Sequence, residues 1–254
     1  MAGVLTANTA HAQAKHSLRE LMFGKHTDNS HDSSRIPNVA HFVSARGAGF
    51  VLDESQAEPL LRFDGDDEVF QLTAKSGANG DITFRNDVGE PVLKVTGLGG
   101  TILFSGAHED VGDPAAVTGQ ATAFAPDRLT LTELVLHMTR SSVRVTHACD
   151  HLFIFNADAE ADEKGGDSAL PLFAESVSVT TDALLQVASQ ADTRHSLDKL
   201  HEVHLIEGRP PSAYIENGIL FVKLDPSRGT WGGHPSSKRI MNVVMTGLDD
   251  ETRR

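Results

Sequence analysis

Apolar and polar residues alternate with a period of two between residues 49 and 104. Leu61 and Phe63 flank Arg62, for example. The other alternating runs are centred on Gln71, Thr83, Lys94 and Leu103. Clusters of Gly, Asn and Asp separate the runs at intervals of about ten residues, which is typical of short strands joined by tight turns. The pattern predicts an antiparallel β-meander over residues 49–104, with one apolar face that another element must cover.

The spacing of apolar residues becomes helical in the second half of the chain, over residues 128–254. Thr130-Leu131-Thr132-Glu133 has the form of a capping box. An apolar stripe at helical spacing follows, formed by Leu131, Leu134, Val135, Met138, Ser142 and Val145. Residues 152–155 are too short a run for a helix and predict a strand, whereas residues 172–191 and 195–200 predict two further helices. We expect these helices to cover the meander.

Strand patterns return near the C-terminus. Residues 203–206 predict one strand, and residues 214–221 predict a hairpin because Asn217-Gly218 suits a type I′ turn. Pro235 stands at a first-turn position and predicts a final helix through Met245. The sequence therefore predicts an α+β fold, with an N-terminal antiparallel β-meander packed against helices, a C-terminal β-hairpin and a final helix. Residues 39–254 are expected to form one domain.

The N-terminal residues resemble the end of an export signal. Residues 1–14 hold no acidic or basic residue and end in Ala12-Gln13-Ala14, the small-x-small pattern that a signal peptidase reads. We expect residues 1–14 to be the remnant of a signal peptide with its true start upstream, and the protein to be periplasmic or secreted. The alternative is an ordinary alanine-rich terminus. Residues 15–38 predict a short helix, with Leu18, Leu21 and Met22 on one face, followed by a flexible arm.

Composition excludes several classes of function. Apolar residues make up 39% of the 254 residues and charged residues 22%, which suits a globular protein. The net charge of −13 should repel phosphate backbones, so we expect no nucleic-acid binding. No apolar run is long enough for a membrane-spanning helix. Cys149 is the only cysteine, so the chain has no internal disulfide.

The region from Arg228 to Arg239 contains the strongest candidate for a binding site. It holds the only tryptophan, in a glycine-rich loop, followed by two serines in the expected first turn of a helix. Free amides at a helix N-terminus bind anions, and an aromatic face can stack on a sugar or another ring. We therefore expect a small anionic or glycan-like ligand, or a protein partner. The candidate residues are Arg228, Trp231, His234, Ser236, Ser237 and Lys238. The alternative is a structural loop whose tryptophan covers the core.

A second cluster surrounds the single cysteine. His147 and His151 are four residues apart, which on a helix would place both on one face, and Cys149 lies between them. The cluster could supply a nucleophile with an imidazole base, or ligands for zinc. However, the segment lies where the helix is expected to give way to a strand, where this geometry fails. We therefore expect no catalytic residue, no bound metal and no cofactor.

Two runs of the sequence resemble a known family. Residues 59–63 (Pro-Leu-Leu-Arg-Phe) and residues 80–93, which include Arg85-Asn86-Asp87-Val88-Gly89-Glu90, are similar to an alphaproteobacterial family of domains of unknown function, numbered 4908. The resemblance implies a bacterial and periplasmic setting. The family has no assigned activity, so the resemblance assigns no functional residue.

The sequence thus predicts an exported, non-enzymatic protein that binds a ligand or a partner. Two alternatives stay open. One is a hydrolase or transferase that depends on Cys149 and a neighbouring histidine, and the other is a divalent-metal binding protein.

Overall fold

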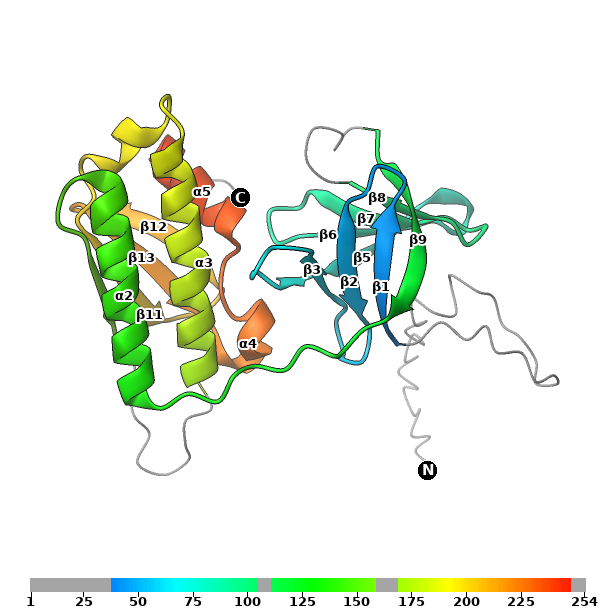
Figure 1. The fold of residues 1–254 in the computed structure, drawn as a ribbon, viewed down its shortest axis with the longest axis horizontal. Helices are drawn as coiled ribbons and strands as arrows, with labels where there is room; N and C mark the ends of the chain where they lie inside the picture. The colour runs from blue at the N-terminus through cyan, green and yellow to red at the C-terminus, as the bar shows by residue number, and fades with distance from the viewer. Residues whose placement is uncertain (1–37, 105–110, 159–168, 248–254) are drawn as a thin grey trace, which may run out of the picture.

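The computed structural model describes residues 38–104, 111–158 and 169–247, which form two lobes side by side (Figure 1). The expected signal remnant and the expected helix and arm of residues 15–38 lie outside this range, except for Asn38. The first lobe is a sheet of strands from residues 39–120, and the second contains helices and a smaller sheet from residues 131–246. Residues 121–130 cross between the lobes as an extended connection. Within the described residues, no helix combines the length and apolar character needed to span a membrane.

The first lobe, which we call the barrel lobe, is one antiparallel sheet that curls round on itself. Its strands are β1 (Val39–Ser44), β2 (Gly49–Asp53), β3 (Leu60–Phe63), β4 (Phe70–Gln71), β5 (Thr73–Ser76), β6 (Ile82–Arg85), β7 (Pro91–Val95), β8 (Thr101–Leu103) and β9 (Asp113–Gln120). Their order is β4-β3-β2-β1-β9-β8-β7-β6-β5. Only Leu72 separates the two edge strands β4 and β5 in the sequence, so one bent segment pairs with both ends of the sheet. Such closure protects sheet edges.

The apolar face of the predicted meander lies inside the barrel lobe. Phe42 and Phe50 stack there at 5.1 Å between ring centroids, and Leu72 from the bent edge is fully buried. Each of the buried residues of this core comes from the barrel lobe itself. The expectation that the later helices cover this face therefore needs correction, because curvature of the sheet buries most of it. The helices meet the barrel lobe only along one side.

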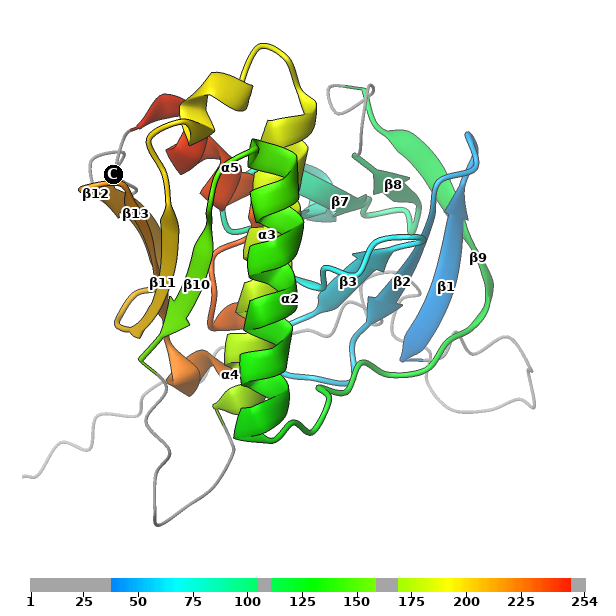
Figure 2. The ribbon, with the colours of Figure 1, turned by 60° about the vertical axis from the view of Figure 1, so that its left-hand side comes forward.

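The second lobe, which we call the helical lobe, packs helices on one face of a four-stranded sheet (Figure 2). Its elements are α2 (Leu131–Cys149), β10 (Ile154–Ala157), α3 (Leu170–Ser189), the 3-10 turn η3 (Arg194–Leu197), β11 (Glu202–Glu207), β12 (Ser212–Glu216), β13 (Ile219–Leu224), the 3-10 turn η4 (Pro226–Arg228), α4 (Gly229–Gly232) and α5 (Ser237–Thr246). The order is β10-β11-β13-β12. The pairs β10–β11 and β11–β13 are parallel, and β12–β13 is the antiparallel hairpin.

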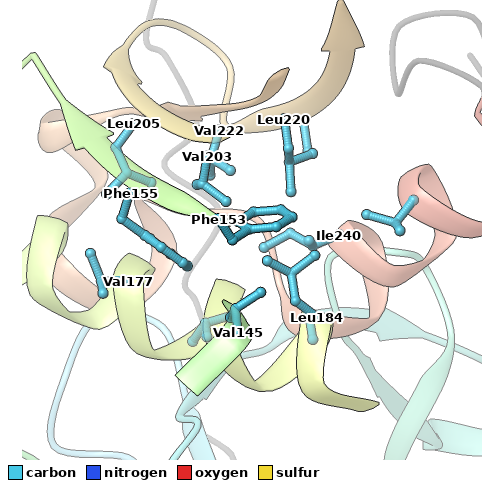
Figure 3. Close-up of a cluster of buried hydrophobic side chains, with 14 of the residues drawn as sticks. Val145, Phe153, Phe155, Val177, Leu184, Val203, Leu205, Leu220, Val222 and Ile240 are labelled. Atoms are coloured by element: carbon cyan, nitrogen blue, oxygen red, sulfur yellow. The ribbon is translucent and has the colours of Figure 1, made fainter. Parts of the chain in front are cut away.

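The core of the helical lobe is separate from that of the barrel lobe. Phe153 and Phe155 from the start of β10 pack against Leu184 of α3, Leu220 of β13 and Ile240 of α5 (Figure 3). Full burial of an aliphatic or aromatic side chain stabilises a fold by about 1.5–3 kcal/mol. Each lobe therefore has an apolar core that its own elements can stabilise.

Local signals account for the ends of several elements. Thr130 and Glu133 form the predicted capping box at the start of α2. Asn217 and Gly218 have φ angles of 51° and 81°, as the type I′ turn between β12 and β13 requires. The α+β class, the C-terminal hairpin and the final helix are confirmed. Strands β1, β5 and β9 were not expected, and two of them extend the sheet beyond the predicted range of 49–104.

Candidate functional site

The segment singled out by its sequence, from Arg228 to Arg239, lies where the two lobes meet. It folds as the end of η4, helix α4, a short loop and the first turn of α5. Ser236 is the N-cap of α5, and its hydroxyl accepts a hydrogen bond from the Arg239 amide at 3.2 Å. The barrel lobe faces this segment with the β3–β4 loop and the β6–β7 turn. We call this contact region the seam.

Two carboxylates of the barrel lobe bind the N-terminus of α5. The Ser236 amide donates to Asp87 Oδ2 at 2.9 Å, and the Ser237 amide donates to Glu68 Oε1 at 2.9 Å. The Ser237 hydroxyl donates to the other oxygen of Glu68. Arg239 Nε also donates to Asp87 at 2.9 Å. The anion that this helix end attracts through its free amides is therefore supplied, in this structure, by the protein itself.

Trp231 helps to hold the lobes together. It packs against a small cluster of barrel-lobe and connecting residues that includes Leu60, Val69 and Phe124. The neighbouring Gly232 lies so close to β4 that an added Cβ would stand 1.9 Å from the side chain of Gln71. A residue larger than glycine would have to displace the Gln71 side chain from this contact. The indole is half-buried, so it has both a structural face and a face that borders open space.

That open space is a hollow of about 360 Å³, which we call the Trp231 pocket. Four of the six candidate binding residues line it, namely Arg228, Trp231, His234 and Ser236. Its other polar lining residues are Glu68, Gln71, Thr73, Arg85, Asn86, Asp87 and Arg239. The sequence-based candidates thus converge on one pocket with residues from the barrel lobe, which sequence spacing could not reveal.

The charges in the Trp231 pocket do not cancel. Asp87 is paired with Arg239, as described above. Arg85 donates to the carbonyl oxygen of Gly89, which is a neutral group, and Arg228 is exposed. Among the residues that the structure describes, neither Arg85 nor Arg228 has a carboxylate as hydrogen-bond partner. The pocket therefore offers two guanidinium groups beside an indole.

His234 forms the buried wall of the pocket. Burial lowers the pKa of its imidazole, so the ring is neutral at neutral pH. Its Nδ1 lies 3.0 Å from the carbonyl oxygen of Pro235 and must donate to it. The Nε2 atom is then an acceptor, and it has no hydrogen-bond partner among the residues that the structure describes. A buried polar atom without a partner costs free energy, so a group in the pocket that donates a hydrogen bond to Nε2 would be stabilised.

The two remaining candidates, Ser237 and Lys238, line a second hollow of about 670 Å³, which we call the acidic cleft. Asp66 and Asp67 of the barrel lobe and Asp182 of α3 border it. Lys238 also borders it but is paired with Glu90. Apolar side chains from both lobes also line it, including Phe63, Phe70, Val92, Phe104, Leu185 and Met241.

Two buried glutamates stand at the seam beside these hollows. Burial raises the pKa of Glu68 to about 7 despite its hydrogen bonds from Ser237. Burial, together with the nearby carboxylate of Glu68, raises the pKa of Glu175 on α3 to about 7 as well. Perturbed carboxylates of this kind mark functional sites more often than other positions. Neither residue was predicted from the sequence, although Glu175 is the only charged residue in the first half of α3, which is otherwise mainly apolar.

The Cys149 cluster has a different geometry from the one that catalysis needs. Helix α2 ends at Cys149, and Asp150 takes the left-handed conformation with φ of 61°. The two ring nitrogens of His151 lie 3.2 Å from the Cys149 carbonyl oxygen and 2.7 Å from the Leu200 carbonyl oxygen. Burial raises the pKa of the Cys149 thiol. A nucleophilic cysteine needs the opposite shift, so this arrangement offers no activated thiolate.

His147 lies on the exposed side of the last turn of α2, so the structure does not bring it together with His151 on one helical face. In the described part of the chain, no group of three or more His, Cys, Asp or Glu side chains could hold a metal ion.

Fold and site together define a two-lobed α+β protein with two hollows along the seam between its lobes. The model of the family described as domain of unknown function (DUF4908) matches residues 17–244, and the chain belongs to this family. The family inferred from residues 59–63 and 80–93 is thereby confirmed, whereas the alphaproteobacterial origin stays a prediction. No curated protein and no solved structure matches the chain.

Proposed function

We propose that this protein is a non-enzymatic binding protein, and that its ligand is a small anion with a ring, such as an acidic sugar or an aromatic acid. The observation that carries the proposal is the convergence of Arg85, Arg228 and Trp231 on one pocket. Guanidinium groups recognise carboxylates and phosphates with paired hydrogen bonds, and an indole stacks on a ring or a sugar face. A volume of about 360 Å³ suits a single ring with its substituents.

The way in which the titratable groups of the Trp231 pocket are held favours binding over catalysis. Glu68, whose pKa is raised to about 7, accepts two hydrogen bonds from Ser237 and so serves the contact between the lobes. His234 is neutral and buried, and Asp87 is held by Arg239 and the Ser236 amide. A protein partner that presents an acidic side chain and an aromatic ring would satisfy the same pocket. We also propose that the protein is exported to the periplasm, on the strength of the Ala12-Gln13-Ala14 pattern. N-terminal sequencing of the protein from its native host tests this, and a mature chain that retains Met1 contradicts it.

Fluorescence of Trp231 tests the binding proposal directly, because it is the only tryptophan in the chain. We expect a saturable shift of its emission with anionic ring compounds such as glucuronate, benzoate and phenyl phosphate. Glucose and benzyl alcohol, which lack the charge, should bind at least about tenfold more weakly, since a charge-assisted hydrogen bond contributes about 1.5–3 kcal/mol.

Matched arginine variants separate the pocket from the general charge of the protein. Arg228→Ala should weaken binding of the anionic compounds about tenfold or more. Arg46→Ala, which removes an exposed arginine on the barrel lobe away from the pocket, should leave binding unchanged. Equal affinity in the two variants, or no response to any compound of the panel, would contradict the proposal.

A further inference from the structure

The acidic cleft is a second site, distinct from the Trp231 pocket, and its lining defines the chemistry of its occupant. Phe63, Phe70 and Val92 of the barrel lobe face Leu185 and Met241 of the helical lobe across it. Phe63 and Phe70 are only half-buried and pack edge to face at 6.1 Å. An occupant that covers these side chains would remove apolar surface from water from both lobes at once.

The rim of the cleft carries an excess of negative charge. Asp66 and Asp67 are exposed, and Asp182 has only a long contact of 3.4 Å with Arg144. Lys238 is the one basic residue in the described lining of the cleft, and Glu90 neutralises it. The cleft is therefore complementary to a segment that combines apolar side chains with several positive charges.

We propose that residues 15–25 of the same chain occupy the acidic cleft. Leu18, Leu21 and Met22 share one face at helical spacing. Around them stand three basic residues, Lys15, Arg19 and Lys25, against a single acidic residue, Glu20. This stretch thus combines apolar side chains with a net positive charge, and both features are complementary to the acidic cleft. The family match begins at residue 17, so most of the stretch belongs to the same family domain as the two lobes.

The register of the barrel strands brings the start of the described chain close to the cleft. Val39 of β1 pairs with Asp53 of β2, which in turn pairs with Leu60 of β3. Phe63, at the cleft, lies three residues further along β3. Two strand spacings and three residues of strand correspond to about 10 Å across the sheet and about 10 Å along it. The residues between Lys25 and Asn38 can span up to about 45 Å when extended, which is ample.

Zero-length crosslinking of the full chain tests this proposal. A carbodiimide joins a lysine amine to a carboxylate as an amide, with loss of water, only where the two groups touch. We expect links from Lys15 and Lys25 to Asp66, Asp67 and Asp182, identified by mass spectrometry of the digested protein. Glu216, which is exposed on β12, serves as the reference carboxylate and should be linked at least about fivefold less.

An equal mixture of ¹⁴N- and ¹⁵N-labelled chains distinguishes the possible occupants. Links within one isotopic form support occupation by the same chain. Links that join the two forms would mean that a second copy supplies the segment, and they would overturn the proposal. Links spread evenly over exposed carboxylates, Glu216 included, or no links to the three cleft aspartates, would overturn it too.

Two variants of the segment separate apolar docking from mere charge attraction. Leu21→Asn removes an apolar side chain without altering the charge of the segment, and should reduce the links to the cleft aspartates about fivefold or more. Glu20→Ala changes the neighbouring residue outside that face and should leave their yield unchanged or raise it. Equal yields from Leu21→Asn and the unaltered chain would mean that the apolar cleft does not hold the segment.

Discussion

The interiors of the two lobes and the seam between them are built on different principles. Phe50 in the barrel lobe and Leu184 in the helical lobe are fully buried among apolar neighbours from their own lobe. The seam instead joins the lobes through Glu68 and Asp87, whose carboxylates bind backbone amides of α5. Apolar packing thus stabilises each lobe, whereas titratable groups join the lobes where they meet, which is where we propose that a ligand binds.

The largest effect should come from cavities in either core. Phe50→Ala should lower the free energy of unfolding by about 3–5 kcal/mol, and Leu184→Ala by about 2–5 kcal/mol, because each leaves a cavity in closely packed surroundings. Urea denaturation followed by circular dichroism measures both. A loss below about 1 kcal/mol in either variant would contradict the separate, well-packed cores.

The second largest effect should be a dependence of the free energy of unfolding on pH, caused by Glu68 and Glu175 at the seam. The pKa of Glu68 in the folded protein is about 7, whereas the ordinary pKa of a glutamate is 4.5. Between these pH values the folded state binds more protons than the unfolded state, so the free energy of unfolding falls as pH rises. The loss amounts to at most about 3 kcal/mol for Glu68, and Glu175 acts in the same direction.

Glutamine variants sharpen this prediction, since glutamine keeps the shape of the neutral acid. Glu68→Gln and Glu175→Gln should each flatten the decline in stability between about pH 5 and about pH 8. Glu216→Gln, which alters an exposed glutamate, should leave the profile as it is. Urea midpoints at a series of pH values measure all three. A profile for Glu68→Gln that declines as steeply as that of the unaltered protein would contradict the role of the seam.

A moderate effect should appear in the reactivity of Cys149. Its thiol is half-buried, and burial raises its pKa, so the thiolate is scarce at neutral pH. Iodoacetamide should label the folded protein about tenfold or more slowly than the urea-unfolded protein at the same pH. Equal rates, or faster labelling of the folded protein, would instead favour the Cys149-dependent hydrolase or transferase.

The smallest effect should follow loss of a surface ion pair at the same seam. Lys238 pairs with Glu90, and both side chains are at least 40% exposed. Lys238→Ala should therefore lower the free energy of unfolding by less than about 1 kcal/mol, because solvent screens such pairs. Urea denaturation at low salt measures the change. A loss as large as that of the core variants would show that surface charge, rather than packing, holds the lobes together.

Local sequence signals predicted much of the fold. The Thr130–Glu133 capping box and the Asn217-Gly218 turn act within a few residues, so their structure could be read directly from the chain. Strand β9 was not predicted because it contains Pro114 and Gly119, and because its other residues show little alternation between apolar and polar side chains. Closure of the barrel could not be predicted either, since β1 pairs with the distant strand β9, and one bent segment must pair with β3 on one side and β6 on the other.

Only part of the candidate site could be predicted from the sequence. Trp231, Arg228 and the Ser236-Ser237 turn stand close together along the chain, and their chemistry pointed to one region. Their partners Glu68 and Asp87 lie more than 140 residues earlier and meet them only after both lobes have folded. Sequence spacing contains no information about such contacts, so the carboxylates at the N-terminus of α5 and the second hollow had to come from the structure.

We propose that the ligand binds at the seam and not in either core. The indole N–H of the single tryptophan gives one side-chain signal in a ¹⁵N-correlated NMR spectrum, so it reports on the Trp231 pocket alone. We predict that a ligand from the anionic ring panel moves this signal progressively to saturation, while the amide signals of Phe50 and Leu184 keep their positions. An indole signal that stays fixed while the ligand binds elsewhere would contradict the account.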